Sequence, residues 1–218
     1  MTKTHRLAAA FLGLLVLAAC QGTQHVNGAV NIAPSEVTGD VSTVNGSVQI
    51  GAQAQAAAVR SVNGDLALGQ GAQAHSLSTV NGAIDIEAQA VVSGDVQTVN
   101  GTLRLATGAQ VGGALNNVNG AITVDGAHVV GRLRTVNGPI SVLNGARIDG
   151  GIRLERPHDL FSSSSSRPPR VVIGRDVSIG GTLRFEHEVK LYVCDQVKHL
   201  GPIEGATPIS YSGDTPPE

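Results

Sequence analysis

Val44-Asn45-Gly46-Ser47-Val48-Gln49-Ile50 decides the fold of this chain, because its first three residues recur along the sequence at a nearly constant interval of 18 or 19 residues. A period in this range is typical of a stack of small structural units, none of which can bury its apolar face alone. Seven copies of Val-Asn-Gly begin at Val26, Val44, Val62, Val80, Val99, Val118 and Val136.

A finer rhythm subdivides each repeat. Apolar residues recur at intervals of six, as at Val44, Ile50 and Ala56, so that three hexads make one repeat. Within a repeat, Val48-Gln49-Ile50 shows the alternation of a strand with one buried face. The sequence therefore predicts an all-β fold, a single-stranded three-sided β-helix (β-solenoid) with about 18 residues per coil.

A string of β-hairpins is the main alternative, since Asn-Gly is the strongest short hairpin signal. A two-residue turn at Asn45-Gly46 would pair Val44 with Ser47 and place this valine on a polar face. In a coil, by contrast, we expect Val44 and Val48 both to point inward. The register therefore favours the solenoid.

Glycine tolerates positive φ, so the glycine of each motif suits a sharp corner. The asparagines would then stack about 4.8 Å apart along the axis, where their amides can form a hydrogen-bonded ladder. We interpret this ladder as a structural staple, with a polar binding stripe as the alternative. The predicted corners are Asn27-Gly28, Asn45-Gly46, Asn63-Gly64, Asn81-Gly82, Asn100-Gly101, Asn119-Gly120 and Asn137-Gly138.

The N-terminus has the pattern of an export signal. Lys3 and Arg6 precede an apolar run, and small residues stand before Cys20. Leu17-Ala18-Ala19-Cys20 resembles the bacterial lipobox, which implies a signal peptide over 1–19, acylation of Cys20 and a short lipidated tether over 20–25. Gln21, rather than Asp, after the cysteine resembles the default signal for the outer membrane. An ordinary secretory signal is the alternative.

Composition narrows the function. Without Lys3 and Arg6 the chain keeps 13 basic against 17 acidic side chains, a net charge of −4, which argues against nucleic acid as a partner. Trp is absent and Phe plus Tyr number five, so the sequence predicts a thin aliphatic core. Cys194 has no intrachain partner if Cys20 carries lipid. We expect it to be buried, with an intermolecular disulfide as the alternative.

The repeat is regular over 26–154 and is then interrupted. From Leu133 to Ile140 is 7 residues, whereas the equivalent step from Ile152 to Val171 is 19, which places an inserted Ser-, Pro- and Arg-rich loop over 155–170. Irregular terminal coils should occupy 171–211 and a tail 212–218. Two outward columns are expected, one of which is formed by Gln55, Gln73, Gln110 and Arg147 with Val91 and Val129 between them. The other contains Gln49, Ala67, Asp85, Arg104, Thr123 and Ser141.

The stretches 108–115 (GAQVGGAL) and 126–133 (GAHVVGRL) are similar to repeats of two bacterial groups. One group is the bactofilins, right-handed β-helices that polymerise end to end, and the other is the adhesin-type β-solenoids of envelope proteins. The resemblance implies a right-handed coil. Two departures weigh against a filament, namely Cys20 only six residues before the first repeat and the proline-rich tail. The six-residue period also resembles hexapeptide acyltransferases, but those keep small residues where Val48 and Leu66 stand.

No pattern of catalytic chemistry is present. The histidines have no metal-ligand spacing, and no phosphate-binding glycine loop occurs. We therefore predict no enzyme, no cofactor and no metal. The expectation is a lipid-anchored β-solenoid of the cell envelope with a structural or adhesin-like role, monomeric, with the membrane and an envelope protein or glycan as partners. A bactofilin-like scaffold is the alternative, and an acyltransferase the remote one.

Overall fold

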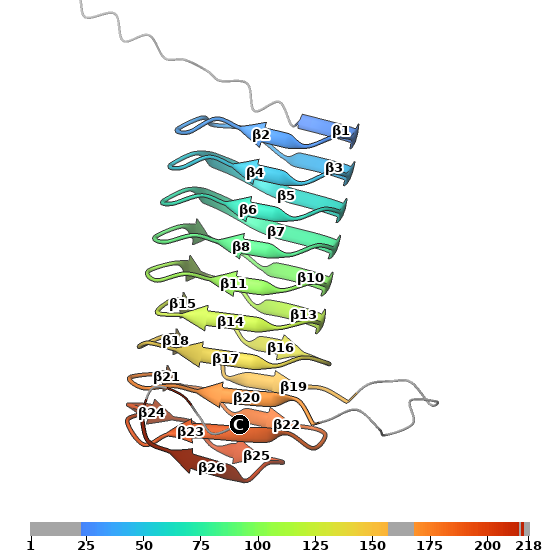
Figure 1. Cartoon of the computed structure of the whole chain (residues 1–218). Helices are drawn as coiled ribbons and strands as arrows, with labels where there is room; N and C mark the ends of the chain where they lie inside the picture. The colour runs from blue at the N-terminus through green and yellow to red at the C-terminus, as the bar shows by residue number, and fades with distance from the viewer. Residues whose placement is uncertain (1–22, 157–167, 214, 216–218) are drawn as a thin grey trace, which may run out of the picture.

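The computed structural model describes residues 23–156, 168–213 and 215 (Figure 1). These residues form an all-β solenoid of about 9 turns, with roughly 19 residues per turn, and the described part of the chain contains no helix. Neighbouring turns pair strand by strand in parallel, and only the strands of the first and last described turns have a partner on one side alone. The predicted fold class is confirmed.

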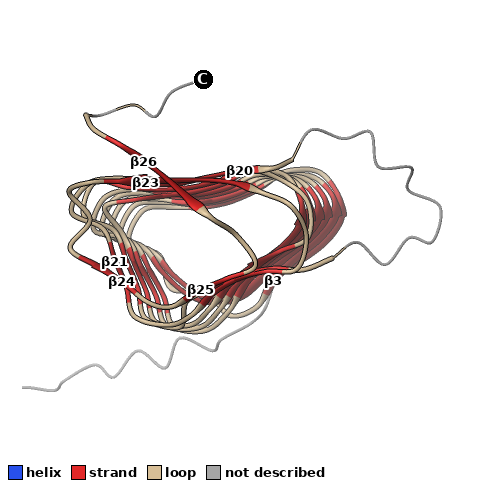
Figure 2. Cartoon of the chain, turned by 90° about the horizontal axis from the view of Figure 1, so that it is seen from below, coloured by secondary structure: helices blue, strands red, loops and turns tan. Residues whose placement is uncertain are grey.

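Three faces enclose the axis (Figure 2). Face one contains β1 (Thr23–Asn27), β3 (Val41–Asn45), β5 (Gln55–Asn63), β7 (Gln73–Asn81), β10 (Val96–Asn100), β13 (Leu115–Asn119), β16 (Leu133–Thr135), β19 (Ile152–Leu154), β22 (Leu183–Phe185) and β25 (Ile203–Glu204). Face two contains β2 (Val30–Ile32), β4 (Val48–Ile50), β6 (Leu66–Leu68), β8 (Ile84–Ile86), β11 (Leu103–Leu105), β14 (Ile122–Asp125), β17 (Ile140–Leu143), β20 (Arg170–Ile173), β23 (Lys190–Cys194) and β26 (Pro208–Tyr211). Face three contains β9 (Val91–Val92), β12 (Gln110–Val111), β15 (His128–Val129), β18 (Arg147–Ile148), β21 (Ser178–Ile179) and β24 (His199–Leu200), and the first halves of β5 and β7 extend it.

The core is the narrow aliphatic column that composition predicts. On face two, the outer residues of each three-residue strand point inward and the middle one points outward, as in β11 and β8. The largest fully buried side chains are all Leu or Ile: Ile50, Leu66, Leu68, Leu77, Ile84, Ile86, Leu103, Leu105, Leu115, Ile122, Leu133 and Ile140. The expected outward column from Gln49 to Ser141 is confirmed by the pairing of face two.

The motif valine does not point inward, and this prediction was wrong. Val44 is 41% exposed, whereas the residue before it, Thr43, is 3% exposed. The strand alternation continues through β3 as far as Thr43, and the chain then turns, so that Val44 and Asn45 both lie outside. The hairpin alternative fails all the same, because Asn45 pairs in parallel with Asn63 one turn later.

A buried hydroxyl column occupies the inward position instead. Thr79 Oγ1 donates a hydrogen bond to the Gly64 carbonyl of the preceding turn at 3.0 Å, and Ser61 and Thr98 make the equivalent bonds. Each bond satisfies a buried hydroxyl and a corner carbonyl that would otherwise lose hydrogen bonds to water. Asn117 takes the same place with its amide, which donates to the Gly101 carbonyl at 3.1 Å.

The corner glycines serve two different purposes. Gly28, Gly120 and Gly138 adopt φ between 114° and 136°, a conformation that side chains rarely take. Gly82 has no such φ, but a Cβ there would meet the carbonyl group of Gly64 in the turn before. Close contact between stacked backbones is therefore the second reason for glycine.

The C-terminal region keeps the coil in register across the insertion. Ile140 pairs with Val171 and Ile152 with Leu183, as the sequence predicts. Residues 157–167 of the expected loop lie outside the described residues. In the outward column of face three, His128 stands where Val129 was expected, because Val129 is buried and pairs with Val111.

The two ends of the solenoid differ from expectation in detail. At the first end, β1 begins at Thr23 and pairs with β3, so the coil already starts within the range assigned to the tether. At the other end, Cys194 is buried, with 2% of its surface exposed, in a small cluster with Val172, Tyr192 and Tyr211 outside the main core. β26 is the last strand of face two and crosses the end of the coil (Figure 2).

Candidate interaction groove

The outward valines of the motif form a continuous apolar stripe along face one. Their exposure falls from 69% at Val26 to 37% at Val118, and Val136 is half-buried. The parallel register of β3, β5, β7, β10 and β13 places them one above another. A row of exposed aliphatic side chains at strand spacing is rare on a monomer surface and marks a candidate interaction site.

Polar side chains line the stripe on one side. Two residues before each valine lies an outward side chain of the same strand, and the column reads Ser42, Arg60, Ser78, Gln97 and Asn116. Shallow hollows of about 520 Å³ and 580 Å³ lie between this column and the valines, the first around Val44 and Val62 and the second around Val99 and Val118. We call this surface the valine groove.

The asparagine ladder borders the valine groove on the other side. The amide Nδ2 of each corner asparagine donates to Oδ1 of the asparagine one turn earlier, as from Asn81 to Asn63 at 2.8 Å and from Asn100 to Asn81 at 3.0 Å. The ladder runs unbroken from Asn137 to Asn27. Because these amides bond to one another along the column, the ladder acts as a staple between turns.

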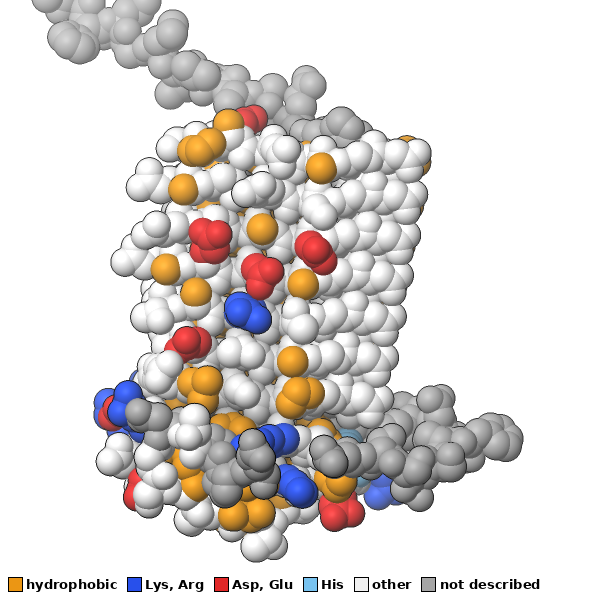
Figure 3. Space-filling model, in the orientation of Figure 1, with side chains coloured by type: hydrophobic (Ala, Val, Ile, Leu, Met, Phe, Trp, Pro, Cys, Tyr) orange, Lys and Arg blue, Asp and Glu red, His pale blue; other side chains and the backbone are white. Residues whose placement is uncertain are grey.

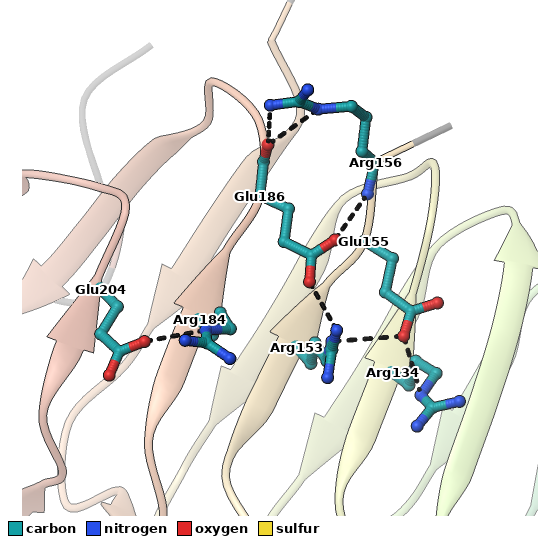
Figure 4. Close-up of polar contacts among 7 residues, drawn as sticks. All are labelled: Arg134, Arg153, Glu155, Arg156, Arg184, Glu186 and Glu204. Atoms are coloured by element: carbon teal, nitrogen blue, oxygen red, sulfur yellow. Dashed lines mark hydrogen bonds and ion pairs between the residues drawn. The ribbon is translucent and has the colours of Figure 1, made fainter. Parts of the chain in front are cut away.

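An arginine–glutamate cluster lies where the valine groove ends (Figure 4). It consists of Arg134, Arg153, Glu155, Arg156, Arg184, Glu186 and Glu204. Glu155 lines the last part of the valine groove, in the turn after Val136. Its Oε1 atom lies 3.3 Å from Nε of both Arg134 and Arg153. Arg153 Nη2 also contacts Glu186 Oε1 at 2.6 Å, so adjacent turns are linked by ion pairs.

Electrostatics in this region favour ionised carboxylates. The backbone N–H of Arg156 donates to Glu186, and together with the Arg153 guanidinium it lowers the pKa of the Glu186 carboxyl. On face three, hydrogen bonds from His128 and Arg147 likewise lower the pKa of Asp149. His128 Nε2 lies 2.8 Å from Asp149 Oδ2. Two such ligands do not make a metal site, and the described residues contain no group of three metal-binding side chains.

Charge is distributed unevenly along the rod. Residues 21–131 carry 2 basic against 7 acidic side chains, whereas residues 132–198 carry 11 basic against 7 acidic ones. On the face shown in Figure 3, most of the Lys and Arg side chains accordingly lie towards the C-terminal end. The net charge of the whole chain does not reveal this difference between the two ends, because it sums over both of them.

The sequence-predicted residues fall into two groups. The Asn-Gly corners lie together in one column, whereas Cys20 lies outside the described residues. Among the residues that the structure describes, no helix has the length and apolar character needed to cross a membrane. No protein-family model, curated protein or solved structure matches the chain.

Proposed function

We propose that this protein is an exported, lipid-anchored β-solenoid of the bacterial cell envelope that acts as a rigid structural or adhesive rod. The single observation that carries the adhesive role is the valine groove, which runs from Val26 to Val136 along one face. The anchor rests on the lipobox-like Leu17-Ala18-Ala19-Cys20. Two fatty acyl chains on one terminus would give stable membrane attachment.

The solenoid suits such a role for mechanical reasons. About 9 turns at strand spacing make a rod of roughly 40 Å. The asparagine ladder links every pair of neighbouring turns along face one from β1 to β13, and the buried hydroxyls from Thr43 to Thr98 and the Asn117 amide add a second row of bonds. A partner with a repeating structure, such as an envelope glycan, could contact the equivalent side chains of several turns at once.

The groove is tested with the double variant Val80→Asp, Val99→Asp. Two carboxylates in the middle of the stripe should lower the binding of the purified protein to isolated cell-wall sacculi by at least about tenfold, because they replace the apolar contact with hydrated charge. Val37→Asp is the matched control, since Val37 is 54% exposed but lies outside the groove. Equal binding by the double variant and the control would contradict the adhesive role.

The anchor is tested separately by Cys20→Ser. This change removes the thiol that would carry the acyl chains, so we expect the protein to move from the membrane fraction to the soluble fraction of the cell. The measurement is partitioning into detergent together with the mass of the mature N-terminus. Membrane association unchanged by the substitution would refute the lipid anchor.

The alternative function is a scaffold that assembles by stacking solenoid ends. One observation favours it, namely that β2 and β1 form the first turn and have no further strand beyond them in the described part of the chain. Against it, Arg156 follows Asn137 in the corner column, so the asparagine ladder stops before the C-terminal end. Sedimentation at several concentrations separates the two, because a scaffold would form filaments and a rod would remain a discrete monomer.

A further inference from the structure

A small pocket at the edge of the arginine–glutamate cluster is lined by three arginines. It has a volume of about 180 Å³ and is lined by Arg132, Ile152, Arg153, Thr182, Arg184 and Glu204. The register of β16, β19 and β22 aligns Arg132 with Gly151 and Thr182 in successive turns, and Arg153 with Arg184 in the neighbouring column. Gly151 carries no side chain, so the backbone is bare between Arg132 and Thr182.

Arg132 differs from its neighbours in its partners. Arg184 Nε is paired with Glu204 at 2.8 Å and Arg153 is paired with Glu186. Arg132 Nε donates to the Gly150 carbonyl at 3.3 Å, and no carboxylate of the described residues lies within ion-pairing distance of its guanidinium. The pocket therefore contains an exposed arginine whose charge is not matched by an acid.

The unmatched positive charge of the pocket is that of Arg132. Of the other two arginines that line it, Arg184 is paired with Glu204, and Arg153 is paired with Glu186 and lies near Glu155. Arg153 Nε is buried and makes no aligned hydrogen bond, although Glu155 lies 3.3 Å away. The Thr182 hydroxyl adds a neutral donor.

We propose that this pocket binds an oxyanion, either a phosphate or a carboxylate group of an envelope polymer. Guanidinium groups form the strongest hydrogen bonds with these anions and hold them in a planar, two-point geometry. A volume of about 180 Å³ is many times the ~15 Å³ that one water needs, which leaves room for such a group with part of its hydration shell. The pocket and the valine groove are formed by different residues. A negative result for anion binding would therefore leave the proposed function of the rod untouched.

The test is calorimetric titration of the purified protein with inorganic phosphate and, in a second arm, with acetate, both at low ionic strength. We expect saturable binding that Arg132→Gln weakens about tenfold, because the variant loses the unpaired charge. Arg104→Gln is the matched control, since Arg104 is an exposed arginine of β11 on face two and should leave binding unchanged. Binding should also weaken as sodium chloride is raised.

Thr182→Val keeps every charge and the side-chain shape, and it should weaken binding about threefold through loss of one donor. Melting curves of each variant show whether the fold is retained. Phosphate binding without acetate binding identifies a phosphate site, and acetate binding extends it to carboxylates. Absence of saturable binding of either anion by the wild-type protein, or equal loss in Arg132→Gln and Arg104→Gln, would overturn the proposal.

Discussion

Replacement of Gly82 by alanine should lower the free energy of unfolding by about 3 kcal/mol. A Cβ at this corner would lie 2.5 Å from the carbonyl carbon of Gly64 and 3.1 Å from the backbone nitrogen of Asp65. Backbone atoms of the preceding turn cannot move aside as a flexible side chain would. The same close contact occurs at Gly64 and Gly101, so the corners on either side of Gly82 have no free space into which the backbone could shift.

The control for this variant is Gly71→Ala. Gly71 has φ of 65°, but a Cβ there would meet only Gln53 Cγ at 3.7 Å. Its cost should be the conformational one alone, about 1 kcal/mol. Urea unfolding followed by circular dichroism measures both. If Gly82→Ala lowered the free energy of unfolding no more than Gly71→Ala does, close contact between stacked backbones would not be the reason for glycine at the corner.

The sequence predicts the fold well because the repeat constrains it many times over. Each turn repeats the alternation seen in Val48-Gln49-Ile50, and a register error in one turn would be inconsistent with all the others. The same redundancy located the insertion, since Ile152 and Leu183 keep their equivalence on either side of it. These conclusions depend only on spacing, which the sequence states directly.

The candidate groove could not be predicted, because it depends on which way one side chain points at a corner. Periodicity alone assigned Val44 to the core, as expected for an aliphatic residue. The available signal was the preceding position, which holds Thr43, Ser61 and Thr79 and suits a buried hydroxyl that bonds to a corner carbonyl. The arginine pocket was missed for another reason: its members come from four turns, and only the three-dimensional register brings them together.

The stability of the rod should depend on position along the axis. Leu103→Ala, in the middle, should cost about 3 kcal/mol, because Leu103 is 1% exposed and turns on both sides pack against it. Ile203→Ala, in the last strand of face one, should cost about 1 kcal/mol, since Ile203 is only partly buried and has a neighbouring strand on one side. The reason is that each turn of a solenoid is stabilised chiefly by its nearest neighbours.

Val80→Ala provides the reference for an exposed aliphatic residue and should change the free energy of unfolding by less than about 0.5 kcal/mol. Chemical unfolding of the three variants gives the ranking, and hydrogen exchange shows where each turn opens. If Val80→Ala lowered the free energy of unfolding nearly as much as Leu103→Ala, the motif valines would have to be core residues, and the valine groove would not exist. Equal costs at Leu103 and Ile203 would instead mean that the nine turns unfold as one unit, with no weaker end.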